Sequence, residues 1–154
     1  MPISTTLKGL EMNKQFSQSL HDQCDEFGRD VVKKFAQSFW NVEVIDNPDK
    51  YGIDLIFMKD GKPTAYAEVE VRLSWKTKEF PYLDLNVPFR KKKLLSNTDL
   101  PTFFFSVNKD GTALFHCDAE AVLSSDVEES RNKYVGKGER FFKVPLHLLD
   151  YVVL

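Results

Sequence analysis

Three acidic side chains interrupt two otherwise apolar segments between residues 51 and 74. Asp54 follows Tyr-Gly-Ile and precedes Leu-Ile-Phe, while Glu68 and Glu70 lie in the run Ala-Glu-Val-Glu-Val. Three carboxylates on one face of a sheet repel one another unless a proton or a cation is bound between them. Hard divalent cations prefer such oxygen ligands. The pattern therefore predicts a divalent-metal site made by these three acids.

The Asp60-Gly61 turn between the two acidic segments sets their register, because it is a strong two-residue hairpin signal. If Met58 pairs with Thr64, Asp54 lies directly opposite Glu68. Opposed side chains share one face of the sheet, with Cβ atoms roughly 5 Å apart. A slip of one residue would turn the aspartate to the other face and destroy the site.

The same residues admit a simpler interpretation. Glu68, Glu70 and Arg72 alternate with apolar residues, as in any antiparallel strand with one solvated face. Asp54 favours the metal site, because Asp is a poor strand former and its neighbours on both sides are apolar. Gly52, two residues earlier, permits a close approach of the backbone.

Length and composition limit the class of protein. The chain of 154 residues is long enough for one domain, and its thirteen Phe predict an aromatic-rich core. Cys24 and Cys117 form neither a metal-binding spacing nor a disulfide framework, which favours a reducing compartment. No apolar run reaches the ~20 residues that a membrane helix needs, and the first residues contain no apolar signal core. We therefore expect a soluble, cytoplasmic protein.

The charge balance is slightly acidic, with a formal net charge of −2 and a pI near 5.9. These values argue against a protein that coats nucleic acid through general charge attraction. They do not exclude a nuclease, because an acidic nuclease site binds phosphate through metal ions. Local basic density exists in the run Arg90, Lys91, Lys92 and Lys93.

Hydrophobic periodicity predicts the order of helices and strands. Residues 11–40 carry apolar side chains at three- and four-residue steps, which indicates a helix with a potential break at Gly28. The further expected elements are a strand at 41–46, a turn at 47–50, the hairpin described above, a helix that starts at 86–88 and runs to 97, paired strands at 102–107 and 112–117, and a short helix at 118–125.

This order predicts a single α/β (α+β) domain, residues 1–154, with a mixed central β-sheet flanked by helices. Its core would span about residues 11–123. Residues 124–140 are polar and are expected to form a mobile loop or flap. Residues 141–154 are apolar and must pack on the core or on another subunit.

The order of elements and the acidic motif together resemble the PD-(D/E)XK nuclease superfamily, whose fold is called restriction endonuclease-like. The superfamily pattern has a leading helix, an Asp at the start of one strand, a Glu-x-Lys in the next strand, and a basic helix that crosses over to a further strand. Gly-Ile-Asp54 matches the Asp position, and Ala-Glu68-Val-Glu70 matches the Glu-x-Lys position. The resemblance covers about residues 26–117.

The chain departs from the superfamily pattern at one position, because Glu70 stands where the family has lysine. Certain restriction enzymes of the superfamily carry Glu at this place and still cleave DNA. Two cations are candidates to replace the lysine. One is Arg72, on the same strand face, and the other is a lysine of the basic helix, Lys91 or else Lys92 or Lys93, because the lysine can migrate to this helix in related families.

The resemblance implies a metal-dependent DNA endonuclease, resolvase- or restriction-like, with Mg²⁺ or Mn²⁺ as cofactor. Asp54, Glu68 and the Val69 carbonyl would hold the metal, and a water activated there would attack phosphorus in line. Glu70 could either bind a second metal or act as the general base on that water. Arg72 or Lys91 would stabilise the negative charge that develops on the phosphate.

The resemblance also implies roles outside the strand pair. Glu26 on the first helix corresponds to the accessory acid, and Arg90, Lys92, Lys93 and Lys76 would contact DNA, although a solvated helix face is the alternative for Lys92 and Lys93. Small domains of this kind resemble phage- or mobile-element-encoded nucleases that act as dimers, so the apolar C-terminal segment could form a homodimer contact. The alternative function is a catalytically inactive member of the same fold that serves as a DNA-binding or protein-interaction module.

Overall fold

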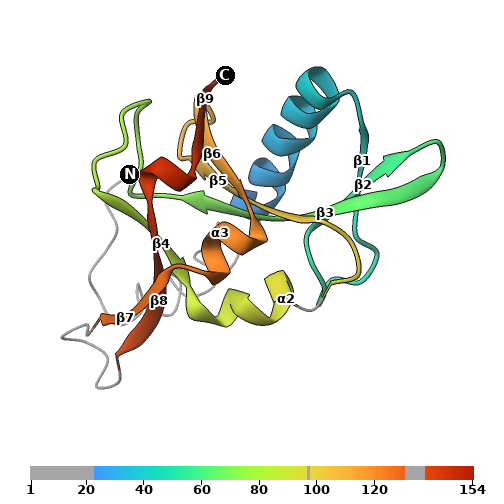
Figure 1. Cartoon of the computed structure of the whole chain (residues 1–154). Coiled ribbons are helices and arrows are strands. Elements are labelled where there is room, and N and C mark those ends of the chain that lie inside the picture. Colours follow the sequence, from blue (N-terminus) through green and yellow to red (C-terminus); the bar gives the residue numbers. More distant parts are fainter. Residues whose placement is uncertain (1–22, 97, 131–137) are drawn as a thin grey trace, which may run out of the picture.

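The computed structural model describes residues 23–96, 98–130 and 138–154. In these ranges the chain forms one mixed α/β domain around a six-stranded sheet, which confirms the predicted class (Figure 1). A helix at 23–35 covers one face of the sheet, and a three-stranded sheet with short helices covers the other. The part of the first helix predicted at 11–22 lies outside the described residues.

The central sheet has the strand order β1-β2-β3-β5-β6-β9. Its strands are β1 (Glu43–Asp46), β2 (Leu55–Lys59), β3 (Lys62–Arg72), β5 (Thr102–Asn108), β6 (Ala113–Asp118) and β9 (Asp150–Val153). Strands β3 and β5 run parallel, and the other neighbours are antiparallel. A parallel pair needs a crossover, and here it contains β4 (Asp84–Pro88), η2 (Phe89–Lys91) and α2 (Lys92–Ser96).

The tip of the β2–β3 hairpin is a two-residue turn in which Asp60 and Gly61 have φ values of 51° and 75°. Positive φ at both central positions is typical of the type I′ turn, whose twist matches that of the strands. The predicted turn is therefore confirmed. The predicted pairing beside it is wrong by one residue, because Met58 pairs with Pro63 and not with Thr64.

A β-bulge directly after Phe57 restores the predicted register further along the hairpin. The bulge adds one residue to β3, so Leu55 lies opposite Ala67, as it would in the predicted pairing. Asp54 was expected inside a strand and instead lies one residue before β2. It nevertheless comes to the position beside Glu68.

The helix at 23–35 packs on the face of β3 that carries its odd-numbered residues, and it continues into a π-helical turn, η1 (Ala36–Trp40). The potential break at Gly28 does not occur. A Cβ at this position would lie 2.7 Å from Val71 Cγ2 and 3.2 Å from Val69 Cγ1. The glycine therefore lets the helix approach the sheet closely.

The second sheet, with the order β4-β8-β7, was not predicted. Residues 86–88 were expected to begin a helix and instead end β4. Leu85 and Val87 are both fully buried, while the positions between and beside them are only partly buried. This alternation has the two-residue period of a strand, and the helix begins only after Pro88.

The polar segment 124–140 is also corrected, because it contributes strands instead of forming only a loop. It contains β7 (Asp126–Ser130) and the start of β8 (Glu139–Pro145), which pair antiparallel. Pairing with the apolar strand β8 orders a polar sequence that has no apolar stripe of its own. Residues 131–137 lie outside the described residues.

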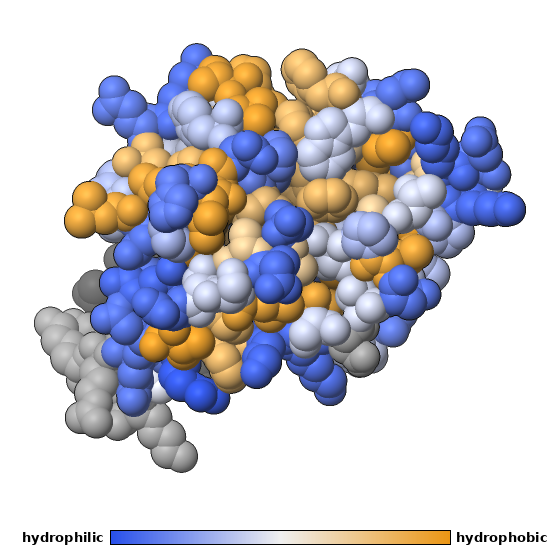
Figure 2. Space-filling model, in the orientation of Figure 1, coloured by the Kyte–Doolittle hydropathy of each residue, from blue (hydrophilic) through white to orange (hydrophobic). Residues whose placement is uncertain are grey.

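The apolar segment 141–154 packs on the core through Phe142, Val144 and Leu149, which are all buried. The remaining short helices are α3 (Ala119–Leu123) and η3 (Leu146–Leu148). In the described part of the chain, no helix has the length and apolar character needed to span a membrane. Figure 2 shows hydrophilic side chains at the far end of the β2–β3 hairpin, where all four residues from 59 to 62 are exposed.

Candidate metal centre

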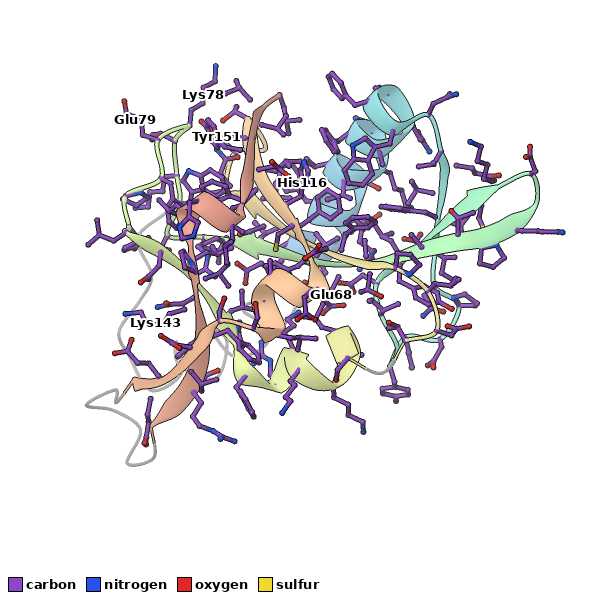
Figure 3. The ribbon with its side chains drawn as sticks, in the orientation of Figure 1. Glu68, Lys78, Glu79, His116, Lys143 and Tyr151 are labelled. Carbon is purple, nitrogen blue, oxygen red and sulfur yellow. The ribbon has the colours of Figure 1, made fainter. Side chains whose placement is uncertain are left out.

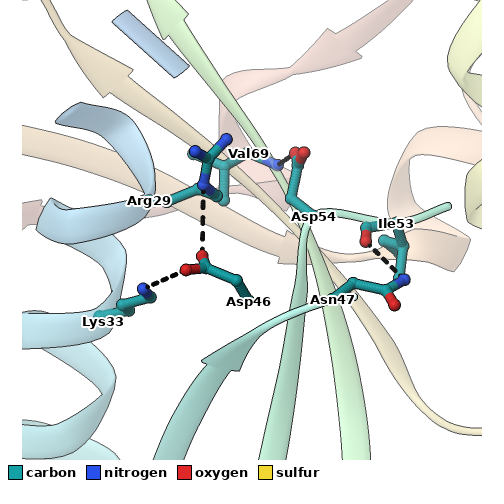
Figure 4. Close-up of polar contacts among 7 residues, drawn as sticks. All are labelled: Arg29, Lys33, Asp46, Asn47, Ile53, Asp54 and Val69. Carbon is teal, nitrogen blue, oxygen red and sulfur yellow. Dashed lines mark hydrogen bonds and ion pairs between the residues drawn. The ribbon is translucent and has the colours of Figure 1, made fainter. Parts of the chain in front are cut away.

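Asp54 is held in place by the hydrogen-bonded loop between β1 and β2 (Figure 4). Asn47 Nδ2 donates to the Ile53 carbonyl at 2.9 Å, and the Asn47 backbone N–H donates to the Asp54 carbonyl at 3.1 Å. A Cβ at Gly52 would lie 2.8 Å from Asn47 Nδ2, so this clamp requires a glycine. At the end of the loop, Asp54 Oδ2 accepts a hydrogen bond of 2.8 Å from the Val69 N–H.

Glu68 lies inside the molecule, between the central sheet and the short helices, and is only 3% exposed (Figure 3). Its Oε2 accepts a hydrogen bond from Lys91 Nζ at 2.5 Å. Its Oε1 is buried and has no hydrogen-bond partner among the described residues. Leaving a buried carboxylate oxygen unpaired is costly. Because the Glu68 side chain is buried, the interpretation of Glu68 as part of a solvated strand face is wrong.

The acidity of Glu68 reflects this environment. Burial raises the pKa of Glu68 from its ordinary value of 4.5 to about 7. The Lys91 ammonium lowers the pKa, whereas the Asp54 carboxylate raises it through repulsion and through a hydrogen bond to the protonated form. The two carboxyl groups are therefore close enough to share a proton or a cation.

Lys91, and not Arg72, lies beside Asp54 and Glu68, which together are called the acid pair. Lys91 is the last residue of η2, and its side chain is 16% exposed. Phe89, in the same turn, packs on Phe142 of β8 with ring centroids 5.2 Å apart. This aromatic contact anchors the turn, so the lysine reaches the acid pair from a fixed position.

Glu70 points to the same face of β3 but belongs to a separate cluster. Its Oε1 accepts hydrogen bonds from Arg72 Nε at 2.9 Å, from Arg72 Nη2 at 2.5 Å and from Ser106 Oγ at 2.9 Å. Arg72 Nη2 also donates to the Asn86 carbonyl of β4. The cluster ties β3 to β5 and to the second sheet. The structure therefore brings together only two of the three acids that were expected to converge, Asp54 and Glu68.

The acid pair fits a hard divalent cation that takes few protein ligands. No group of three or more His, Cys, Asp or Glu side chains in the described ranges is arranged to hold a metal. Two carboxylates suffice for Mg²⁺, which keeps several waters and usually takes one or two carboxylates together with substrate phosphates. The N–H and C=O of a strand residue point to the same side, so the Val69 carbonyl faces the Asp54 side and offers a third oxygen.

The remaining predicted site residues lie on the surface. These exposed residues are Glu26, Lys76, Arg90, Lys92 and Lys93. Glu26 lies on the helix at 23–35 and is exposed. Arg90 lies 3.9 Å from Glu139 of β8, and Lys92 Nζ lies 5.4 Å from the centre of the Phe89 ring.

A hollow of about 240 Å³ opens beside Asp54, between the helix at 23–35 and the β1–β2 loop. Arg29 and Lys50 supply the cations in its lining. Arg29 Nε is held 3.3 Å from Asp46 Oδ1, as Figure 4 shows. Neither cation was predicted from the sequence, because the helix and the loop that carry them are distant in the sequence and meet only through packing.

No family model, curated protein or solved structure matches this chain. The chemistry of the acid pair is therefore the basis for assigning a function.

Proposed function

We propose that the protein is an intracellular, Mg²⁺- or Mn²⁺-dependent DNA endonuclease that hydrolyses phosphodiester bonds. One observation carries the proposal: the buried Glu68 carboxylate has an oxygen without a hydrogen-bond partner in the described ranges, a second acid beside it and a lysine 2.5 Å away. Two acids and one lysine are the side chains needed to hold a divalent cation and to stabilise charge on a phosphate.

The arrangement of strands supports the same proposal. An Asp precedes β2, the Glu lies on β3, and a basic crossover leads to β5, which is parallel to β3. This is the arrangement that the resemblance to the PD-(D/E)XK superfamily implies. The restriction endonuclease-like fold is accordingly part of the proposal. Lys91 takes the place of the motif lysine, because it reaches Glu68 while Glu70 is engaged by Arg72.

The two acids of the pair share one role, and Lys91 and Glu70 have others. Asp54, oriented by the Val69 N–H, and Glu68 would hold the cation, which would supply Lewis-acid activation of the phosphodiester and of the attacking water. Because Lys91 Nζ contacts Glu68 Oε2, it is also within reach of a phosphate bound at the pair. There the ammonium would stabilise the negative charge that develops during attack. Glu70 would hold Arg72 and strand β5 in position.

The proposed partner is DNA, contacted by the exposed cations around the crossover. Arg90, Lys92 and Lys93 follow one another along η2 and α2, next to the lysine of the acid pair. Such local cations bind the phosphate backbone even when the whole protein is slightly acidic. Lys76, in the loop after β3, would extend this contact.

The proposed assembly is a homodimer through β9, the outer strand of the central sheet. The Leu154 N–H donates to the Thr112 carbonyl, so the N–H and C=O groups of Tyr151 and Val153 point away from β6. Two copies paired antiparallel about Val152 would join these groups in an isologous contact.

Val153→Pro tests this assembly, because it removes one outward-pointing N–H donor and no hydrogen bond to β6. The substitution should convert a dimer to a monomer, as measured by light scattering. A monomeric native protein would contradict this assembly.

The alternative is a catalytically inactive module of the same fold, which binds DNA or a protein. One observation favours it: Lys91 already compensates the charge of Glu68, so the pair is partly balanced without a cation. In that case Mg²⁺ would leave the melting temperature unchanged, whereas a cation that binds only the folded state raises it.

Cleavage of supercoiled plasmid and of branched DNA at low salt, with Mg²⁺ or Mn²⁺, tests the proposed function. We expect Asp54→Asn and Glu68→Gln each to reduce cleavage at least about 100-fold, because a catalytic metal supplies several kcal/mol and each 1.36 kcal/mol is a factor of ten. Asp60→Asn and Glu43→Gln make the same chemical changes at exposed positions and serve as matched controls. DNA that stays intact with both metals would contradict the endonuclease.

A further inference from the structure

A second hollow, of about 380 Å³, lies between the β1–β2 loop and α2. This volume is within the range of roughly 300–1,000 Å³ that is typical of small-molecule sites. Its lining includes two aromatic rings, Tyr51 and Tyr66, the apolar side chains of Ile53 and Leu94, and the cation Lys93. The hollow therefore offers flat apolar walls as well as polar groups.

Tyr51 is the most unusual residue of this hollow, because 84% of it is exposed although it lies on an ordered loop. The Tyr51 N–H donates to Asp49 Oδ1 at 3.0 Å, and the Asp49 N–H donates to Asn47 Oδ1 at 3.0 Å. The Gly52 N–H donates to the Asp49 carbonyl at 3.1 Å. These bonds fix the backbone that carries the ring, while the ring itself contributes little to the core.

The charges in the hollow indicate what can enter it. Asp49 and Asp99 both line it, and Asp99 Oδ1 accepts a hydrogen bond of 3.1 Å from the Tyr66 hydroxyl. These carboxylates repel a phosphate but accept hydrogen bonds from the amino groups of bases. Lys50 Nζ lies 5.5 Å from the centre of the Tyr51 ring, and Lys93 is exposed. A neutral, flat ring inside, attached to a phosphate outside, matches this pattern.

The position of the hollow relates it to the acid pair. Asn47, Asp49, Gly52 and Ile53 line both this hollow and the one beside Asp54, so the same loop separates the two. We propose that the Tyr51 hollow binds an unpaired nucleobase of the DNA, stacked on the Tyr51 ring, while an adjacent phosphate lies at the acid pair. This inference rests on the proposed function and specifies its substrate as DNA with at least one unstacked base near the cleavage site.

A short single-stranded oligonucleotide with one 2-aminopurine tests the inference in Ca²⁺, which takes the same oxygen ligands as Mg²⁺. Stacking quenches the fluorescence of this base, and base–aromatic stacking contributes about 1–3 kcal/mol. We expect Tyr51→Ala to weaken binding about tenfold and to abolish the quenching, and Tyr51→Phe to restore both. Tyr82→Ala, at a tyrosine that is 48% exposed elsewhere, is the matched control and should bind as the native protein does.

The outcomes separate this inference from the proposed function. If Tyr51→Ala binds and quenches like the native protein while Asp54→Asn abolishes cleavage, the nucleobase site is wrong and the endonuclease stands. If Tyr51→Ala loses the quenching but no DNA is ever cleaved, the nucleobase site stands and the endonuclease is wrong. Failure of Tyr51→Phe to restore binding would also overturn the stacking. Because the Tyr51 ring is exposed, Tyr51→Ala and Tyr51→Phe should melt at the native temperature.

Discussion

Glu68 and Glu70 lie two residues apart on the same face of β3, and each contacts a cation at 2.5 Å. Their surroundings nevertheless differ. One oxygen of Glu70 receives three hydrogen bonds, two from Arg72 and one from Ser106. Within the part of the chain that the structure describes, Glu68 receives a hydrogen bond from Lys91, has a buried oxygen without a partner, and lies beside a second acid.

This difference distinguishes an acid that supports the fold from one that is available for chemistry. Three donors converge on one oxygen of Glu70, and the side chain is partly exposed, so its charge is already compensated and it has less to gain from a metal than Glu68 has. Lys91 satisfies one oxygen of Glu68, and Asp54 adds repulsion. An acid that remains unsatisfied in the folded state gains most when a cation binds.

Removing the Lys91 ammonium group that contacts Glu68 should give the largest loss of stability. Lys91→Met leaves the buried carboxylate unpaired, and breaking a buried ion pair costs about 3–5 kcal/mol. Because Lys91 lowers the pKa of Glu68, its removal raises that pKa above about 7. The loss should therefore be larger at pH 8, where Glu68 of the native protein is ionised and paired with Lys91, than at pH 5, where Glu68 is protonated. Urea unfolding at both pH values measures the effect, with exposed Lys62→Met as control. Equal losses at the two pH values would contradict the assignment.

The native protein without metal should itself lose stability as the pH rises. The folded-state pKa of Glu68, about 7, lies above its ordinary value of 4.5, so the folded state binds this proton more tightly than the unfolded state does. The contribution of Glu68 is complete below pH 4.5 and decreases by about 3 kcal/mol by pH 7. The difference in unfolding free energy between the native protein and Glu68→Gln isolates this contribution. A difference that does not change between pH 4.5 and 7 would refute it.

Breaking the ion pair between Glu70 and Arg72 should lower the stability of the fold and leave Mg²⁺ binding unchanged. Glu70→Gln removes the charge that holds Arg72, and we expect a loss of about 1–3 kcal/mol, typical of hydrogen bonds to charged groups. The loss should be the same with and without Mg²⁺, because Glu70 is not part of the acid pair in the structure. Thermal unfolding in both buffers measures it. A loss that disappears in EDTA would show that Glu70 takes part in metal binding.

Removing the repulsion at the acid pair should stabilise the protein slightly. Asp54→Asn keeps an oxygen that accepts from the Val69 N–H and removes the charge that raises the pKa of Glu68. The melting temperature without metal at pH 8 should rise by a few degrees, which corresponds to roughly 1 kcal/mol. At the same time the variant should lose the stabilisation by Mg²⁺. Asp60→Asn, at the exposed hairpin turn, is the control, and a destabilised Asp54→Asn would argue against repulsion.

Much of the site could be predicted from the sequence because the hairpin is local. The Asp60-Gly61 turn and the alternation of apolar residues placed Asp54 beside Glu68, and the structure agrees for the inner pairs of the hairpin. The predicted pairing at the tip was wrong, and the register held only because the bulge adds one residue to β3. A bulge depends on the packing of both strands, which no short sequence pattern reports.

The second sheet could not be predicted, because its strands lie far apart in the sequence and two of them are polar or short. β4 pairs with β8, more than fifty residues later. β7 carries three acidic residues among its five and pairs with β8. Contacts of this kind decide where η2 lies, and therefore which lysine reaches Glu68.

The sequence by itself determined the mixed α/β class, the hairpin turn and the pairing of one aspartate with one glutamate, because these depend on neighbouring residues and on a two-residue period. Tertiary structure alone decided that Lys91 contacts Glu68, that Glu70 accepts hydrogen bonds from Arg72, and that Tyr51 lines a hollow. The physical reason is that burial and charge pairing join residues from distant segments. A carboxylate's surroundings, and not its place in a motif, decide whether it supports the fold or is available to bind a cation.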